Sequence, residues 1–398
     1  MTTTRNLLRG FLTALASASL AASLLVFPAV ASAATWTIQT TPNASGAEHS
    51  SLYDVSCNVL ATNPCVSVGK QTDSSGKSGP YAQAWNGASW TNISAAVPVG
   101  ATAGELQSVD CMWLIEPLLC VAAGSYTSSG VTKSLIVTGG TAGLSTLQST
   151  PDPEGASETA LKGVSCKGPA ACMAVGYSVK SGKKTALALV SSESKWVIQA
   201  LPEPAGAISS ELHGVDCIGG SSCLAVGSYS LSAGEPQWAW SAAWNGSTWS
   251  LQAVPKPASS QRSVLLDVSC STSECTGVGG YRNSSGVQVS FVQRWNGTAW
   301  SLQSSPNPVG STNTVFQGVS CIGTGGSLCV AVGDWHNGKA WQPMAQAWTG
   351  SAWVLDTTPT PAGATETILE GVACRSTCLA SGWYADSLGK RKTLGESR

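Results

Sequence analysis

The sequence predicts an all-β fold built from a repeated unit, and three observations lead to this prediction. The fourteen cysteines form seven close pairs, whose first members are 54, 55, 51, 53, 51 and 53 residues apart. Each period contains four short segments with the apolar or alternating character of β-strands, separated by turn residues. Helical periodicity is absent, and charged residues make up 11% of the chain, against roughly 25% in an average domain.

One unit shows the order of the expected strands. Residues 161–166 (LKGVSC) form the first, residues 172–178 (CMAVGYS) the second, residues 185–190 (TALALV) the third and residues 195–199 (KWVIQ) the fourth. In the fifth unit, Asn296-Gly297 between apolar segments is a strong hairpin signal. Four strands per unit at a period near 53 residues predict a seven-bladed β-propeller with four antiparallel strands per blade. A β-solenoid and several separate small sandwiches are the alternatives.

The two ends of the chain complement each other. The last unit stops at Arg398 within its third strand, and the segment ATWTIQTTPNASG from Ala34 matches the missing fourth strand. We therefore expect the N-terminal strand to join the last blade, which closes the ring and removes two exposed sheet edges.

Residues 1–33 have the features of a cleaved export signal. Arg5 and Arg9 precede an apolar run from Phe11 to Val30, and small residues follow at 31–33. A retained membrane anchor is the alternative, because the apolar run approaches the length of a bilayer span. We expect residues 34–398 to form a single propeller that is secreted or held at the cell surface, with no membrane span after cleavage.

The paired cysteines bracket the turn between the first and second strands of each unit. In an exported chain an even cysteine count favours disulfides, here one local bridge per blade. Zinc is the competing interpretation, but the number of residues between paired cysteines varies from three to eight, and no unit offers a matching histidine. We expect disulfides, and no bound metal or cofactor. The expected pairs are Cys57 with Cys65, Cys111 with Cys120, Cys166 with Cys172, Cys217 with Cys223, Cys270 with Cys275, Cys321 with Cys329 and Cys374 with Cys378.

The repeat resembles kelch-like propellers, most closely in CTGVGGYRNSSGVQVSFVQRWNGTAWSLQSSPNP. There Gly279-Gly280 ends the second strand and Trp300 opens the fourth. Other units depart from the pattern, with a single glycine such as Gly176 or Gly333 and with cysteine pairs that kelch units generally lack. The chain looks like a variant of exported bacterial repeat propellers, and this resemblance implies no assigned activity.

One position at the start of each first strand differs between units while its neighbours repeat. We expect these residues to ring the mouth of the central channel, on the face that carries the long connections, because long loops on a rigid scaffold usually carry function. A solvated rim without a binding role is the alternative. The residues are Tyr53, Gln107, Lys162, His213, Leu266, Gln317 and Glu370.

The tryptophans divide into repeated and unit-specific positions. Those that recur around the third-to-fourth-strand turn are expected to pack in the core, because large rings at a repeated position belong to the repeat. Trp238, Trp335, His336 and Trp341 lie near second-to-third-strand loops, and exposed rings there could stack on sugars. Covering the blade edge is their alternative role. The recurring residues include Trp85, Trp90, Trp244, Trp249, Trp295, Trp300, Trp348 and Trp353.

Composition and motifs favour a binding module over an enzyme. The net charge of −1 offers no reason for nucleic acid as a partner, and no catalytic triad stands out in the sequence. We expect a monomeric, non-catalytic module that binds a glycan or an extracellular protein. A polysaccharide hydrolase or lyase is the alternative, with Glu370 opposite Asp110 or Asp216 as one conceivable pair of carboxylates. In their units, Asp110 and Asp216 stand where other units have a serine, directly before the first cysteine. A buried hydrogen-bonding role is therefore the alternative to a catalytic one for both residues. A cell-surface structural protein is the third possibility.

Overall fold

The computed structural model describes residues 33–58, 64–112, 118–192, 195–219, 221–234, 237–323 and 328–398. Residues 1–32 of the predicted export signal lie outside the described residues. Ala33–Arg398 forms one compact unit, and all regular secondary structure described in it is β-strand. Within the described ranges, no helix has the length and apolar character needed to cross a membrane.

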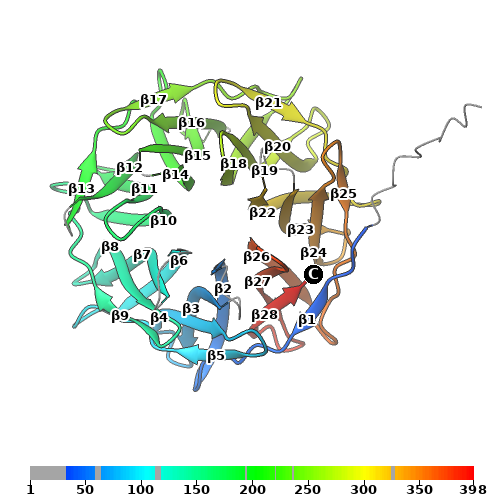
Figure 1. Cartoon of the computed structure of the whole chain (residues 1–398), viewed down its shortest axis with the longest axis horizontal. Coiled ribbons are helices and arrows are strands. Elements are labelled where there is room, and N and C mark those ends of the chain that lie inside the picture. Colours follow the sequence, from blue (N-terminus) through cyan, green and yellow to red (C-terminus); the bar gives the residue numbers. More distant parts are fainter. Residues whose placement is uncertain are drawn as a thin grey trace, which may run out of the picture. The chain divides into compact units, whose positions relative to one another are not determined.

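Antiparallel hydrogen bonding groups the strands into meanders of four (Figure 1). The first strands are β2 (Ala47–Cys57), β6 (Ala103–Met112), β10 (Glu158–Cys166), β14 (Ser209–Ile218), β18 (Arg262–Ser271), β22 (Asn313–Ile322) and β26 (Glu366–Cys374). The second strands are β3 (Cys65–Asp73), β7 (Leu119–Ser128), β11 (Cys172–Lys180), β15 (Ser222–Ser230), β19 (Glu274–Arg282), β23 (Leu328–His336) and β27 (Cys378–Ala385).

The third and fourth strands complete each meander. The third strands are β4 (Ser78–Trp85), β8 (Val131–Gly140), β12 (Lys183–Ser192), β16 (Trp238–Trp244), β20 (Gln288–Trp295), β24 (Trp341–Trp348) and β28 (Arg391–Ser397). The fourth strands are β5 (Trp90–Ile93), β9 (Gly143–Leu147), β13 (Lys195–Gln199), β17 (Trp249–Gln252), β21 (Trp300–Gln303) and β25 (Trp353–Leu355), and β1 (Thr37–Gln39) takes this place beside β28.

The first strands lie innermost and the fourth strands outermost around a common centre (Figure 1). Two of the five sheets contain eight strands, because single parallel bridges, Glu158 to Thr132 and Gln288 to Asn313, each join two meanders. Four-stranded sheets arranged around a centre are the architecture of a β-propeller.

The N-terminal strand β1 pairs with the last strand of the chain. Thr37 lies opposite Ser397 and Gln39 opposite Gly395 in an antiparallel register. Next to it, Trp36 is 1% exposed and its Nε1 donates to Asp356 Oδ2 at 3.1 Å. The indole therefore anchors the N-terminal segment in the core beside β25.

The apolar core lies between consecutive meanders. Each large cluster combines buried side chains from two of them, such as Val175 and Ala188 with Leu212 and Trp240. One cluster unites the first meander with the last, through Val55, Trp90, Ala373 and Leu379. No meander therefore buries its apolar faces alone. Of the recurring tryptophans, Trp90, Trp244, Trp249, Trp295, Trp300 and Trp353 are buried, at 5% to 8% exposure.

The seven cysteine pairs form the predicted local disulfides, one in each meander. Each joins two residues that lie directly opposite each other on the first and second strands, with Cα atoms 3.9 to 4.1 Å apart. So short a separation is typical of the non-hydrogen-bonded pairs of an antiparallel ladder. The amide of the first cysteine therefore points away from its own second strand.

The pairing of all fourteen cysteines agrees with the pairing expected from the sequence. On the second strands, Cys65 binds Cys57, Cys120 binds Cys111, Cys172 binds Cys166, Cys223 binds Cys217, Cys275 binds Cys270, Cys329 binds Cys321 and Cys378 binds Cys374. Within the described part of the chain, no cysteine is left as a free thiol. The zinc alternative is therefore wrong, because a disulfide sulfur has no thiolate to offer a metal ion.

Candidate functional site

Each first strand contains a β-bulge at the position where the sequence varies. In β2, Leu52 pairs with Gly69 and Asp54 pairs with Val68, so Tyr53 has no partner in β3. A bulge bends the strand and redirects the extra side chain. The same register shift occurs in every first strand, so the variable residue of each has no partner on the second strand. These residues are Tyr53, Gln107, Lys162, His213, Leu266, Gln317 and Glu370.

A glycine on the second strand permits each bulge. A Cβ atom at Gly69 would lie 2.0 Å from the Ser51 carbonyl oxygen, and at Gly279 it would lie 2.2 Å from the Val264 oxygen. The other second strands repeat this contact, so the bulge depends on a residue without a side chain opposite it. These glycines are Gly69, Gly124, Gly176, Gly227, Gly279, Gly333 and Gly382.

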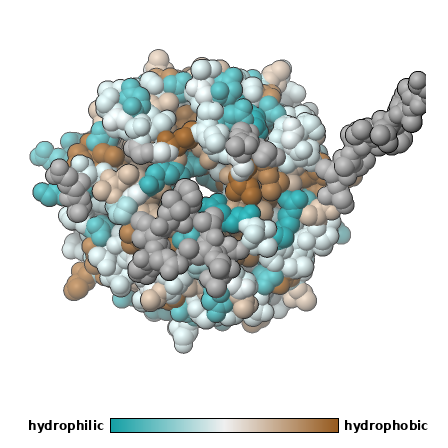
Figure 2. All heavy atoms as spheres, in the orientation of Figure 1, coloured by the Kyte–Doolittle hydropathy of each residue, from teal (hydrophilic) through white to brown (hydrophobic). Residues whose placement is uncertain are grey.

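The seven bulge residues line one cavity of about 420 Å³, here called the mouth cavity. Tyr177, Lys184 and Glu211 complete its described lining. A second cavity of about 250 Å³, the inner cavity, extends along the first strands from the bulge residues to the cysteines. Figure 2 shows the hollow at the centre of one face, with hydrophilic side chains along part of its border.

Lys184 and His213 lie beside Glu211 in the wall of the mouth cavity. Its Oε2 lies 3.0 Å from Lys184 Nζ and its Oε1 lies 3.8 Å from His213 Nε2. Burial opposes ionisation of Glu211, but His213 and Lys184 outweigh it and hold the pKa of this carboxyl below its usual value. Burial also lowers the pKa of His213. Lys162 makes no ion pair or hydrogen bond among the described residues, so its ammonium is available to a ligand.

Glu370 has the opposite electrostatic environment. Burial raises the pKa of its carboxyl, and Trp383 Nε1 donates to its Oε1 at 3.0 Å. The mouth cavity therefore presents two carboxyl groups, Glu211 and Glu370, whose pKa values are shifted in opposite directions.

In three meanders, the residue after the second-strand glycine contacts the bulge residue of the same meander. Gln317 Nε2 donates to Asp334 Oδ1 at 3.0 Å, and His213 Nε2 lies 3.2 Å from Ser228 Oγ. Trp383 and Glu370 form the third such pair. Sequence reasoning missed Ser228 and Asp334, although a glycine inside a strand signals a bulge and thereby marks the residues beside it.

The unit-specific aromatic residues lie apart from the described lining of the mouth cavity. Trp335 is half-buried in β23 and packs against the cluster around Phe316. Trp341 packs against buried Ile368 and Trp383, and its ring centroid lies 5.1 Å from that of His336. Lys256 Nζ lies 3.7 Å from the centroid of Trp238. Each of these tryptophans thus already has part of its surface covered.

In six of the seven meanders, the residue before the first-strand cysteine links that meander to the next. Asp110 Oδ2 accepts the Cys166 N–H at 2.7 Å, and Asp216 Oδ2 accepts the Cys270 N–H at 2.7 Å. Ser56, Ser165, Ser269 and Ser320 accept the corresponding amides of Cys111, Cys217, Cys321 and Cys374 at 3.0 to 3.2 Å. We call these six residues the inner belt. In the last first strand the position is Ala373, which has no side-chain acceptor to offer Cys57.

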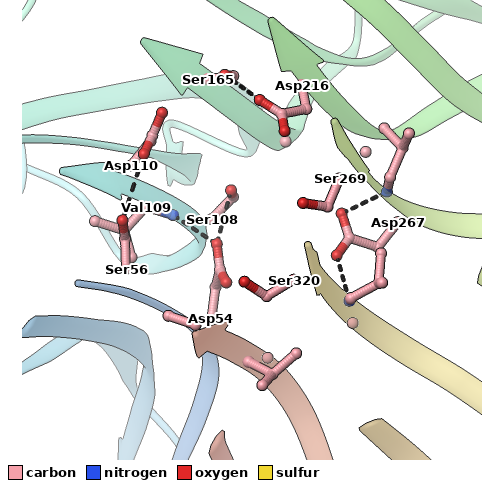
Figure 3. Close-up of a pocket in the computed structure, with 18 of the residues that line it drawn as sticks. Asp54, Ser56, Ser108, Val109, Asp110, Ser165, Asp216, Asp267, Ser269 and Ser320 are labelled. Carbon is pink, nitrogen blue, oxygen red and sulfur yellow. Dashed lines mark hydrogen bonds between the residues drawn. The ribbon is translucent and has the colours of Figure 1, made fainter. Parts of the chain in front are cut away.

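Residues two positions before the inner belt add a second row of contacts (Figure 3). Asp54 Oδ2 accepts bonds from Ser108 Oγ and the Val109 N–H, both at 2.9 Å. Asp267 Oδ2 accepts the Val319 N–H at 2.8 Å. Burial raises the pKa of Asp54 to about 6, and burial together with the charge of Asp54 raises the pKa of Asp267 to about 8.

The inner carboxylates are therefore engaged in hydrogen bonds to neighbouring strands. Asp110 and Asp216 accept backbone amides, and Asp216 Oδ1 also lies 3.0 Å from Lys167 Nζ. Neither lines the mouth cavity, whereas Glu370 does. Among the described residues, no group of three or more histidine, cysteine, aspartate or glutamate side chains is placed to hold a metal ion.

No protein-family model matches the chain, and no curated protein matches its sequence. Among solved structures, the chain is similar to an ulvan lyase, a polysaccharide lyase bound to -[GlcA(1-4)Rha3S]-, with a TM-score of 0.51 and 9% identity over 85% of this chain and 90% of that one. At this identity the likeness is one of fold alone.

Two further solved structures are weaker matches. A lectin from Burkholderia pseudomallei has a TM-score of 0.49 and 13% identity over 86% of this chain and 94% of that one. The β-propeller domain of the Trilobed protease from Pyrococcus furiosus has a TM-score of 0.49 and 9% identity over the same shares of the two chains. The kelch-like resemblance stays a prediction, since none of these structures bears on it.

Proposed function

We propose that this protein is a secreted, closed seven-bladed β-propeller that binds a glycan in the mouth cavity without transforming it. The observation that carries the proposal is the convergence of all seven bulge residues on one cavity. The residue at this position differs from one repeat to the next, while the residues beside it stay alike. This pattern is expected where the scaffold is repeated and each repeat makes a different contact with the ligand.

The pairing of β1 with β28 supports ring closure. The buried cluster that joins Val55 and Trp90 to Ala373 and Leu379 supports it as well, because it fills the space between the first and last meanders. Export is supported by the seven disulfides, since such bonds persist in oxidising compartments.

The lining of the mouth cavity favours a glycan over a protein partner. A concave site with several hydrogen-bonding groups can surround a small polyhydroxylated ligand, whereas protein partners more often use larger, flatter surfaces. Gln107, Gln317, Tyr53 and Lys162 supply amide, phenol and ammonium groups to this cavity, and Leu266 adds one apolar side chain.

A glycan array probed with the oxidised mature chain tests the proposal. We expect specific binding by the wild type and its loss in a variant with Gln107→Ala and Lys162→Ala. A matched control with Gln252→Ala and Lys195→Ala, which changes the same residue types on outer strands, should bind like the wild type. A further variant, Trp335→Ala with Trp341→Ala, tests the tryptophans predicted from the sequence.

Three results would count against glycan binding in the mouth cavity. The first is absence of binding by folded wild-type protein, which would direct the search to protein partners or to a structural role. The second is unchanged binding in the Gln107 and Lys162 variant. The third is loss of binding only in the tryptophan variant, which would place the binding site beside the loop between β23 and β24.

A polysaccharide hydrolase or lyase is the second candidate, and the opposite pKa shifts of Glu211 and Glu370 favour it. A carboxylic acid with a raised pKa and a carboxylate with a lowered one are the pair that acid and base catalysis requires. Incubation of bound polysaccharides with the protein, followed by measurement of new reducing ends or unsaturated products, tests this function. Turnover that disappears in Glu370→Gln while binding persists would establish an enzyme.

A further inference from the structure

A side cavity of about 280 Å³ adjoins the mouth cavity between the first and last meanders. Its described lining comes from β2, β3 and β28 and consists of His49, Ser51, Tyr53, Lys70, Thr72 and Arg391. Tyr53 lines both cavities, so the two cavities meet at this residue.

The described lining of the side cavity contains cationic groups and no carboxylate. The Arg391 guanidinium stacks over the Trp383 ring, 4.0 Å from its centroid. It makes no ion pair or side-chain hydrogen bond among the described residues, although the ring restricts its position. Lys70 Nζ lies 3.4 Å from Glu105 Oε2, and Glu105 also accepts a bond from Gln107.

Neutral donors complete this lining. Ser51 is only 4% exposed, and its hydroxyl has no hydrogen-bond partner in the described part of the chain. His49 Nδ1 accepts the backbone N–H of Arg391 at 3.1 Å, which leaves the proton of a neutral imidazole on Nε2 as a donor.

We propose that the side cavity binds the acidic substituent, a carboxylate or a sulfate, of a glycan whose adjoining ring occupies the mouth cavity. This inference rests on the proposed function. Arginine recognises planar carboxylates and sulfate-like oxygens through its fork of N–H donors, and Ser51 adds a hydroxyl. Lys162, without an ion-pair partner among the described residues, adds a second positive charge along the same ligand.

Calorimetric titration with matched oligosaccharides tests the acid requirement. One pair is an oligogalacturonate and its methyl ester, and the other is a chondroitin sulfate tetrasaccharide and its desulfated form. The first pair removes the carboxylate charge and the second removes the sulfate, so together they identify which acid group binds. We expect the acidic member of at least one pair to bind about 10-fold to 100-fold more tightly, the range for charge-assisted hydrogen bonds.

Two variants locate the effect in the side cavity. Arg391→Gln should abolish the preference for the unmodified member of the pair while binding of the esterified or desulfated member stays within about twofold, and Ser51→Ala should weaken binding of the unmodified member by about 2-fold to 10-fold. Arg282→Gln, at an exposed arginine on β19, is the matched control and should leave the preference unchanged. Urea midpoints equal to that of the wild type establish that the variants are folded.

The outcomes separate this inference from the proposed function. Equal binding of both members of each pair, or an acid preference that survives Arg391→Gln and Ser51→Ala, would overturn the side cavity as the acid site and leave glycan binding intact. Binding of inorganic sulfate without any preference for acidic glycans would assign the cavity to free anions instead. If no glycan binds, the proposed function and this inference fail together.

Discussion

The bulge residues and the inner belt occupy the same first strands, three positions apart, yet they behave in opposite ways. The inner belt uses serine or aspartate in six of the seven meanders, and each member accepts a backbone amide from the next meander. The bulge positions hold seven residues of six different types, and their side chains line the mouth cavity instead.

This difference shows how the fold separates assembly from recognition. A backbone amide needs the same acceptor wherever it occurs, so the inner belt repeats. Because the bulged residue has no partner in the strand ladder, its side chain can change without breaking a backbone bond. We infer that substitutions in the belt affect stability first and substitutions at the bulges affect binding first.

The largest expected effect is the loss of Asp216. Replacement by alanine removes the acceptor of the Cys270 N–H and leaves Lys167 without its carboxylate at 3.0 Å. We expect Asp216→Ala to lower the free energy of unfolding by about 2 to 4 kcal/mol, measured by urea denaturation. Asp216→Asn keeps one acceptor oxygen, so its free energy of unfolding should fall by less.

Lys162→Ala, at a bulge, is the control and should change the free energy of unfolding by less than about 0.5 kcal/mol. A larger loss at Lys162 than at Asp216 would contradict the separation.

The second expected effect is a dependence of stability on pH that comes from Asp267. Its folded-state pKa is raised to about 8, above the value near 3.9 of an unfolded chain. Between these values the folded state holds a proton that the unfolded state has lost, so stability falls as the pH rises from about 4 to about 8. One pKa unit corresponds to about 1.4 kcal/mol, and solvent in the cavity screens part of the shift. We therefore expect the free energy of unfolding to fall by about 1 to 2 kcal/mol over this pH range.

Asp267→Ser isolates this contribution, because Ser108 holds the same repeat position and accepts the Val164 N–H at 3.3 Å. We expect the variant to have a smaller decline in unfolding free energy between pH 4 and pH 8 than the wild type. Parallel pH profiles for the two proteins would show that Asp267 titrates normally in the folded state.

The smallest expected effect is a gain at the interface between the last and first meanders. Ala373 replaces the belt residue there, so the Cys57 amide lacks the side-chain acceptor that its counterparts have. A serine at this position should stabilise the protein by about 0.5 to 1.5 kcal/mol, the usual net contribution of one hydrogen bond. Urea denaturation measures the unfolding free energy of Ala373→Ser, which should rise. The same measurement on Ser320→Ala, which removes an existing bond, should show a fall. A destabilised Ala373→Ser would mean that this interface lacks the belt geometry.

The repeat allowed much of the local structure to be predicted. The seven cysteine pairs predicted the seven disulfides, and residues 195–199 form β13 with the expected bounds. The variable positions were expected around one opening, and they line one cavity. The bulges were not predicted, because strand alternation does not reveal an extra residue. The glycines opposite them, such as Gly69, carried the signal.

The side cavity depends on contacts that no local pattern contains. His49 and Arg391 are 342 residues apart and meet because β2 and β28 belong to adjoining meanders. Lys70 joins them from β3. The fit of Trp335 and Trp341 into apolar clusters also depends on neighbours from other strands.

The sequence by itself determined the all-β class, the repeat length and the disulfides, because each follows from a pattern that recurs within about 53 residues. Only the tertiary structure decided which side chains share a cavity, which carboxylates accept backbone amides and which cationic side chains line the side cavity. The physical reason is that burial, charge and hydrogen bonding depend on distances across meanders. Those distances arise only when the repeats pack against one another around a common centre.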